Sequence, residues 1–409
     1  MAVNTLLTIQ MITNELLLRF KNNLGFSGAI DHTWDDKFAV TGAKIGDTLR
    51  LRDPVRYNVT KGRVITPQDT VETQKFLVLN QQAVVPFQFT SAELTLSIDA
   101  FRDRYLDSAA VSLANQVDVD GLTMAYQSTG NQVGTPGTPI TTLDPFWAAG
   151  ETLDLFSAPM DGKRTMCISP KLQTAALKAA QGLFQSSNQV KQQYERGRMG
   201  IMGGFEWVMD QNVRTHTVGP LGGAPQVTTA GQTGSTLLVS GFTAAAGLRL
   251  KKGDSFTLPT VFAVNAVSGD PQSDLLKFVV TADVSSDASG AASIPIYPPI
   301  IVAGVPRNPY QTVTNSPAAG APLTITSGAA NALIPQNLAF HQAAFTIGMA
   351  PLAIPAGVNF AANAVDPDTG VSIRTISDYD IINDLFITRC DVLYGHAAPR
   401  PEWATRIVQ

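Results

Sequence analysis

The sequence predicts an α+β fold that contains an inserted all-β domain, and three patterns support this prediction. The stretch from about Ile98 to about Gln127 has the periodicity of an amphipathic helix. A segment that begins at Asp47 alternates apolar and charged residues with the period of two that is typical of strands. From about Pro220 to Pro335 the chain consists of short β-like runs separated by clusters of Gly, Pro and Ser.

The N-terminal residues form a predicted short amphipathic arm. Apolar residues recur there at roughly helical spacing, and Asn22, Asn23 and Gly25 then indicate the end of the helix. We expect four of these apolar residues to lack a partner within their own subunit and to dock on a neighbour or on another assembly protein. They are Leu6, Ile9, Leu16 and Leu17.

A long two-stranded hairpin is predicted after the arm. Leu49 and Leu51 fall on one face, Arg50 and Arg52 fall on the other, and a turn at residues 60–62 reverses the chain. An isolated hairpin is marginally stable in water, so this one requires a surface to contact, and the candidate is another subunit. The basic residues expected to meet acidic surface there are Arg50, Arg52, Arg56, Lys61 and Arg63.

The central part of the chain is predicted to combine helices and strands. In the long helix, apolar residues step by four and charged residues between 102 and 107 take the other side. A shorter helix is expected over Asp144–Phe156 and a strand over Lys163–Ser169. Pro170 favours a further helix start, because proline is tolerated in the first turn, and Phe205–Met209 indicates another strand.

The remaining part of the chain is predicted to form mainly β-strands. The β-like runs between Pro220 and Pro335 are Leu237–Val239, Leu248–Leu250, Phe278–Val280 and Ile294–Tyr297. An apolar stretch from Leu338 to Ile354 follows, and a turn is expected from Asp366 to Gly370. The last predicted strands are Val371–Ile376 and Ile381–Leu393.

Composition restricts the classes of function. Charged residues make up 15% of the 409 residues, against about 25% in an average domain, so an unusual share of the surface suits burial against neighbours. The net charge is −4, and no block of Lys or Arg could neutralise a run of phosphates, which argues against specific nucleic-acid binding. Neither a secretory signal nor a membrane span is recognisable, so we expect a soluble protein made in the cytoplasm.

The sequence indicates no catalytic residue, no cofactor site and no metal site, and therefore no enzyme. Cys167 and Cys390 lack any metal-binding spacing and are expected to be buried free thiols. Asp118 and Asp120 resemble part of a calcium loop, but the residues at the first and last ligand positions lack carboxylates, so we assign them to the surface of the long helix.

Three short segments, in order and with matching spacing, resemble the coat proteins of the P22-like podoviruses. They are Leu113–Val117, Leu250–Phe256 and the ending from Arg389 to Glu402. The resemblance covers nearly the whole chain, and it implies the HK97-like capsid fold with an additional β domain. It also implies that Tyr394 to Trp403 returns beside the long helix.

By this resemblance the chain divides into seven parts. They are an N-terminal arm (1–33), an extended-loop hairpin (34–90), a peripheral domain with the spine helix (91–160), a first axial part (161–219), the inserted β-rich domain (220–335), a second axial part (336–393) and a C-terminal return strand in the peripheral domain (394–409). The P22-like proteins carry a long charged loop near the start of the inserted domain. Residues 221–240 of this chain contain no charged residue, so that particular bridge between subunits is not expected.

The function implied by the resemblance is that of a major capsid protein of a tailed bacteriophage. The implied partners are further copies of the chain in pentamers and hexamers, a scaffolding protein, a portal at one vertex, and packaged DNA through non-specific contact. No membrane contact is implied, and the location is the virion capsid, assembled in the host bacterial cytoplasm. The alternative is a glycan-binding or enzymatic module, which predicts an aromatic-lined cleft in the β-rich segment.

Overall fold

The computed structural model describes residues 9–32, 48–52, 56–57, 74–90, 107–180, 200–304, 308–358, 360–367 and 369–409. Helices and strands both contribute to it, as the α+β prediction requires. The chain forms two compact units, which are described separately below. Unit 1 comprises residues 1–51, 74–121 and 345–399, and unit 2 comprises residues 52–73, 122–344 and 400–409.

Unit 1 is built around one long strand, β22 (Leu385–Ala397). Three antiparallel neighbours pair with it: β19 (Thr346–Ala350), β21 (Ser372–Asp380) and β3 (Gln81–Thr90). Strand β20 (Phe360–Val365) extends the sheet beyond β21. The predicted turn from Asp366 to Gly370 joins β20 to β21, and it closes through a hydrogen bond from the Gly370 amide to the Asp366 carbonyl (2.9 Å).

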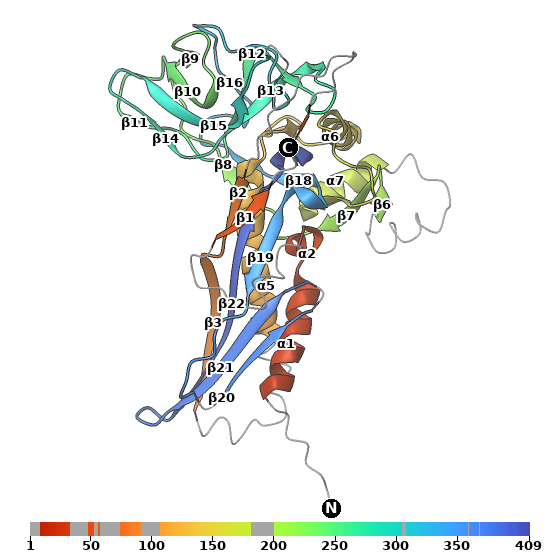
Figure 1. The fold of residues 1–409 in the computed structure, drawn as a ribbon, viewed down its shortest axis with the longest axis vertical. Helices are drawn as coiled ribbons and strands as arrows, with labels where there is room; N and C mark the ends of the chain where they lie inside the picture. Colours follow the sequence, from red (N-terminus) through yellow and green to blue (C-terminus); the bar gives the residue numbers. More distant parts are fainter. Residues whose placement is uncertain are drawn as a thin grey trace, which may run out of the picture. The chain divides into compact units, whose positions relative to one another are not determined.

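The N-terminal helix α1 (Ile9–Asn23) packs on β20 and β21 of this sheet (Figure 1). Leu16, Leu17 and Phe20 are buried beneath it, and the Lys21 ammonium pairs with the Asp366 carboxylate at 2.6 Å. The expectation that Leu16 and Leu17 lack a partner within their own subunit is therefore corrected. These side chains bury their apolar surface in the core of unit 1, which is the ordinary fate of the apolar stripe of an amphipathic helix.

The long helix α5 (Asp107–Ser128) ends one residue after the predicted end. Its expected start near Ile98 lies outside the described residues. The Asp118 carboxylate, which is buried, accepts hydrogen bonds from the amides of Gly25 (2.7 Å) and Ser27 (2.8 Å) at the start of the short helix α2 (Phe26–Ala29). Assigning Asp118 to an exposed helix surface was wrong, because the N-terminal segment covers it.

The structure contains the base of the predicted hairpin. Strand β1 (Thr48–Arg52) pairs with β2 (Gln74–Val78) in a two-stranded sheet. The expected turn at residues 60–62 lies outside the described residues.

Unit 2 contains a six-stranded mixed sheet in the order β4-β23-β18-β5-β7-β6. Its strands are β4 (Gln132–Val133), β5 (Arg164–Ile168), β6 (Ile201–Met202), β7 (Phe205–Met209), β18 (Asn337–His341) and β23 (Ala404–Ile407). Helices α6 (Asp144–Leu155) and α7 (Pro170–Ala180) follow the predicted starts, and both have proline in the first turn. One apolar core joins these helices to the sheet through residues such as Phe146, Leu153, Leu172 and Met166.

The β-rich segment of unit 2 also matches its predicted runs. Strands β9 (Gln226–Val227), β10 (Gly234–Ser240), β12 (Ser255–Val264), β13 (Pro271–Val280), β15 (Ala292–Ile300) and β16 (Thr324–Ile325) form a sheet, and β11 (Gly247–Leu250) pairs with β14 (Val284–Ser286). The buried apolar residues of this segment cluster between Val227 and Leu323. Strands β8 (Thr215–Thr217) and β17 (Leu333–Pro335) pair with each other at its two ends.

The C-terminal part of the chain contributes to both units. Residues 345–399 belong to unit 1 and residues 400–409 to unit 2, so the predicted second axial part, residues 336–393, has residues in each unit. The single apolar stretch from Leu338 to Ile354 supplies two strands, β18 in unit 2 and β19 in unit 1. A short 3-10 helix (Gln342–Ala344) separates them, and no break in the apolar pattern marks the change.

Candidate functional site

The predicted interface residues other than Arg56 fall into three groups. Leu16 and Leu17 lie in the core of unit 1. The backbones of Ile9, Arg50 and Arg52 lie in α1 and β1, and their side chains are not described. Leu6, Lys61 and Arg63 lie outside the described residues.

Arg56 is the predicted interface residue whose side chain is both described and exposed. Its guanidinium lies 3.8 Å from the Glu402 carboxylate and 5.9 Å from the centre of the Tyr310 ring. The Tyr297 hydroxyl donates to the same carboxylate at 3.0 Å. The acidic partner of Arg56 in this structure therefore belongs to its own chain. An ion pair this exposed contributes about 0 to 1 kcal/mol.

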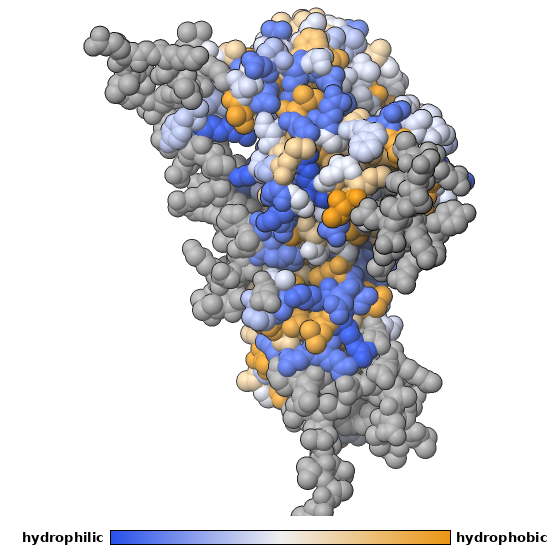
Figure 2. All heavy atoms as spheres, turned by 90° about the vertical axis from the view of Figure 1, so that its right-hand side faces the viewer, coloured by the Kyte–Doolittle hydropathy of each residue, from blue (hydrophilic) through white to orange (hydrophobic). Residues whose placement is uncertain are grey.

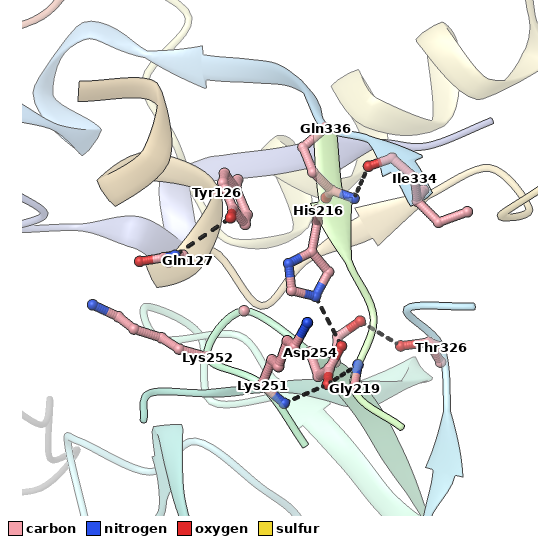
Figure 3. A network of polar contacts seen from close by, with 12 residues as sticks. Tyr126, Gln127, His216, Gly219, Lys251, Lys252, Asp254, Thr326, Ile334 and Gln336 are labelled. Atoms are coloured by element: carbon pink, nitrogen blue, oxygen red, sulfur yellow. Dashed lines mark hydrogen bonds and ion pairs between the residues drawn. The ribbon is translucent and has the colours of Figure 1, made fainter. Parts of the chain in front are cut away.

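A buried polar network forms the joint between the β-rich segment and the rest of unit 2. The Asp254 carboxylate accepts from the Gly219 amide (3.0 Å) and the Lys251 amide (2.8 Å), and the His216 Nε2 lies 2.8 Å from it (Figure 3). His216 and Asp254 are both buried. The carboxylate thus fixes the end of β8, the β11–β12 loop and the chain entering the β-rich segment against one another.

Gln132 makes a second connection across this joint. Its side chain accepts from the Ser255 hydroxyl (3.0 Å) and donates to the Thr326 carbonyl (2.6 Å), while the Lys277 ammonium donates to its backbone carbonyl (2.6 Å). Burial lowers the pKa of Lys277, and Asp274 opposes that change. A single residue of β4 therefore contacts three strands or loops of the β-rich segment.

Arg406 is fully buried beside this network. Its guanidinium donates to the Gly253 carbonyl at 2.7 Å. Burial lowers the pKa of Arg406 to about 10, and the Asp254 charge opposes this effect. The Arg406 charge is buried and only partly compensated. Its hydrogen bonds and the opposing Asp254 charge therefore add little net stability, because removing the guanidinium from water is costly.

The network lacks the parts of a catalytic triad. The Ser255 hydroxyl bonds to Gln132 and Thr326 and has no bond to His216, and the Asp254 carboxylate has no access to solvent. A triad requires a nucleophile that is hydrogen-bonded to its base and reachable by substrate. The hydrogen bonds of this network therefore hold neighbouring segments of the chain in position.

The two cysteines of the chain lie in its interior. Cys167 and Cys390 are buried free thiols, as predicted. Burial raises the pKa of Cys390 to about 12, so the reactive thiolate is scarce at neutral pH. Within the described ranges, no three His, Cys, Asp or Glu side chains are grouped as metal ligands. The described helices are also too short or too polar to cross a membrane.

Sequence reasoning singled out Leu250–Phe256 as a resemblance, yet it assigned no role to Asp254, His216, Gln132 or Arg406. Their partners are distant in the sequence, as in the pair of His216 and Asp254. Only the Lys-Gly-Asp-Ser turn at 252–255 gave a local signal.

The family model described as P22 coat protein, gene protein 5, matches residues 1–405. The chain belongs to the P22 coat protein family. It is a major capsid protein of a tailed phage, and the predicted family is confirmed. The predicted HK97-type α+β fold class of this coat protein is confirmed as well.

Solved structures similar to the coat protein include three from different sources. One from Mycobacterium phage Che8 has a TM-score of 0.46 and 12% identity, and the match covers 93% of this chain and 90% of that one. The capsid of Ralstonia phage GP4 has a TM-score of 0.44 and 8% identity, with 91% and 85% covered. A virus-like particle from Pyrococcus furiosus has a TM-score of 0.40 and 9% identity, with 97% of both chains covered. No curated protein sequence matches the coat protein.

Proposed function

We propose that this coat protein assembles as pentamers and hexamers into a procapsid with the help of a scaffolding protein, with a portal at one vertex, in the cytoplasm of a host bacterium. The match to the coat protein family over residues 1–405 is the observation that supports this proposal. The working parts are then surfaces, and the chain has no catalytic role.

Contact with packaged DNA is proposed to be non-specific. The chain has 29 basic and 33 acidic residues, which gives a net charge of −4. A protein that reads or tightly binds DNA instead concentrates Lys and Arg on one surface. The shell would enclose the genome without recognising its sequence.

A glycan-binding or enzymatic role is less well supported. The described hollow of about 500 Å³ beside α7 is lined by residues 139–141 and by Lys171, Thr174, Ala175, Lys178 and Ala179, none of them aromatic. In the β-rich segment, Tyr297 binds Glu402 and Tyr310 contacts Arg56. Both rings therefore make contacts within their own chain.

The basic extended segment is proposed to hold adjacent subunits together. Arg50 and Arg52 lie on β1 at the base of a hairpin that cannot form an apolar core of its own. Each contact is weak, but every subunit of a closed shell repeats it.

The double variant Arg50→Glu with Arg52→Glu tests this role. The unassembled subunit should melt at nearly the wild-type temperature, while shell formation is lost or misdirected, more severely at high salt, where the remaining pairs are screened. Particle yield by sedimentation and electron microscopy, together with the melting temperature, provides the measurement. Arg50→Lys with Arg52→Lys keeps the charge and should assemble. Normal shells from the Glu variant at every salt concentration would show that these arginines face solvent.

A further inference from the structure

The fully buried guanidinium of Arg406 has hydrogen-bond donors that the protein does not use. One terminal nitrogen, Nη1, donates to the Gly253 carbonyl at 2.7 Å and lies 3.5 Å from the side-chain oxygen of Gln336. Among the atoms that the structure describes, Nε and the other terminal nitrogen, Nη2, have no hydrogen-bond partner, and neither is open to solvent. Buried donors are nearly always paired, so these two indicate a partner from outside the polypeptide chain.

The two unused donors lie on the same edge of the guanidinium. This group is planar, and its Nε–H bond runs parallel to one N–H bond of Nη2. The parallel pair is the fork with which arginine holds a carboxylate or another anion. Arg406 therefore keeps the edge of its guanidinium that suits an anion free of protein contacts, while the remaining nitrogen binds a backbone carbonyl.

Two other buried arginines show what this edge contacts elsewhere in the chain. Both Nε and Nη2 of Arg374 donate to the Asp391 carboxylate, which is the two-pronged form of the contact. Nη2 of Arg164 donates to the Asp154 carboxylate at 2.7 Å. Arg406 is equally buried, but no described carboxylate lies within hydrogen-bond distance of its Nε or Nη2.

The charges around Arg406 leave a positive excess in the interior. Asp254 opposes the burial that lowers the Arg406 pKa to about 10, so the guanidinium stays charged at neutral pH. The Asp254 oxygens, however, are engaged by two backbone amides and by His216 (Figure 3). Lys277 adds a second positive charge: burial lowers its pKa, Asp274 opposes this, and the Arg406 charge lowers it further.

We propose that Nε and Nη2 of Arg406 bind a small monovalent inorganic anion, such as chloride, within the joint between the β-rich segment and the rest of unit 2. An anion at this edge satisfies both donors and also neutralises the buried charge, whereas a water molecule satisfies the donors alone. The site exists only when β23 has paired and Arg406 has reached Gly253, so the anion binds the folded subunit and stabilises it.

Urea denaturation of the unassembled full-length chain at increasing chloride concentration tests this site. Potassium gluconate replaces potassium chloride at constant ionic strength, so that screening of surface charges does not change. Raising chloride from about 5 mM to about 500 mM should increase the ratio of folded to unfolded chain at least about tenfold at a fixed urea concentration. Bromide in place of chloride should have a similar effect.

Arg406→Met removes the fork and should abolish the chloride dependence, whatever its effect on stability itself. Arg249→Met is the matched control. All three guanidinium nitrogens of Arg249 donate to protein oxygens, namely the Ser286 hydroxyl and the carbonyls of residues 221, 243 and 245. Because Arg249 has no unused fork, its variant should keep the chloride dependence of the wild type.

A second variant keeps the proposal testable if Arg406→Met does not fold. Lys277→Met leaves the fork intact and removes the neighbouring positive charge, so at least about threefold more chloride should be needed for the same stabilisation. An unchanged chloride requirement in this variant would contradict the site.

The remaining outcomes also decide the proposal. Equal chloride dependence in the wild type and in Arg406→Met would indicate an adventitious ion only, bound elsewhere on the subunit. Stability of the wild type that does not depend on chloride or bromide would mean that water occupies this edge of the guanidinium. Either result overturns the anion site, and neither affects the proposed role in shell assembly.

Discussion

Two buried polar side chains of unit 1 occupy different contacts: Asp118 holds the N-terminal segment, and His396 lies where β22 meets α5. Asp118 satisfies two amides at the start of α2, which would otherwise lack partners inside the protein. The His396 ring lies edge-on to Tyr394, with 5.5 Å between ring centres, and the Tyr394 hydroxyl donates to Asp120 of α5. The resemblance placed the segment from Tyr394 onward beside the long helix, and this contact agrees with it.

Acid should destabilise the unassembled subunit through His396. Burial lowers its pKa to about 4 from an ordinary value of 6.5, a nearby His32 acts in the same direction, and Asp120 opposes both. The unfolded chain therefore binds this proton at a higher pH than the folded one. Stability is complete above pH 6.5 and falls as the pH drops toward 4, by about 2 kcal/mol between pH 7 and pH 5.

Urea denaturation at pH 7 and pH 5 measures this effect, with His396→Leu as the comparison. The variant should lose less stability over this interval than the wild type. Burial also lowers the pKa of His32, so part of the slope should remain. Asp366, whose pKa lies below its ordinary 3.8, contributes a loss only at more acidic pH and leaves the interval unaffected. Equal slopes in wild type and variant would show that His396 does not titrate as inferred.

Among the elements, α5 shows most clearly what sequence periodicity could and could not predict. The helix and its apolar face, including Ala109, Leu113 and Val117, were predicted from spacing alone. The partners of Asp118 and Gly121 could not be predicted, because they come from the N-terminal segment and from β22. A pattern within one helix carries no information about such distant partners.

The strand β22, which follows the turn at residues 378–384, gives a second example. Residues 381–393 were predicted as one strand, but Ile381 and Ile382 belong to the turn and β22 begins at Leu385. Their side chains have strong β propensity, yet the Asp380 carboxylate captures the Ile382 amide and redirects the backbone. Side-chain hydrogen bonding to the backbone thus outweighed propensity at this position.

Two glycines in helices should respond in opposite ways to alanine. A Cβ at Gly121 of α5 would lie 2.9 Å from His396 Nε2 and 3.0 Å from Phe26 Cε1, whereas one at Gly150 of α6 would lie 3.5 Å from its nearest neighbour, on Phe205. Gly150→Ala should stabilise the subunit by about 0.5 to 1 kcal/mol through helix propensity. Gly121→Ala should destabilise it by about 1 to 3 kcal/mol, because the packed rings must shift.

Urea denaturation of the two variants under identical conditions makes this comparison. Equal stabilisation by both would indicate that the contact between α5 and the N-terminal segment is loose enough to absorb a methyl group.

For the whole molecule, the individual strands of the β-rich segment could be recognised in the sequence, whereas the pairing of the C-terminal strands could not. Gly, Pro and Ser clusters separate the strands between Pro220 and Pro335, so each β run could be recognised locally. The assignment of β19 to unit 1 and β23 to unit 2 depends on pairing between residues far apart in the chain. Neither the composition nor the local pattern of residues predicts such pairings.

The β-rich segment is expected to fold in isolation. Its apolar core lies between Val227 and Leu323, and Phe156 is the described hydrophobic residue from outside residues 220–335 that packs against it. A fragment of residues 214–336 should melt cooperatively. It should do so at a temperature about 4 °C or more above that of residues 220–335, because it retains His216 beside Asp254 and the pairing of β8 with β17.

Circular dichroism and calorimetry of both fragments check this expectation. Gradual melting of the longer fragment would mean that the segment depends on the six-stranded sheet of unit 2. Equal melting temperatures would mean that the joint contributes no stability to the segment.

The position of β23 in its sheet has a consequence for the order of events during synthesis. This strand lies between β4 and β18, yet it follows every other described strand along the chain. A ribosome working from the N-terminus therefore releases β4, β5, β7 and β18 before the strand that joins two of them exists. Until residues 404–407 emerge, β4 is not joined to β18 and Arg406 cannot reach Gly253. A growing chain thus stays incomplete in unit 2, and only a chain translated through this strand presents the finished surfaces of that unit to other copies.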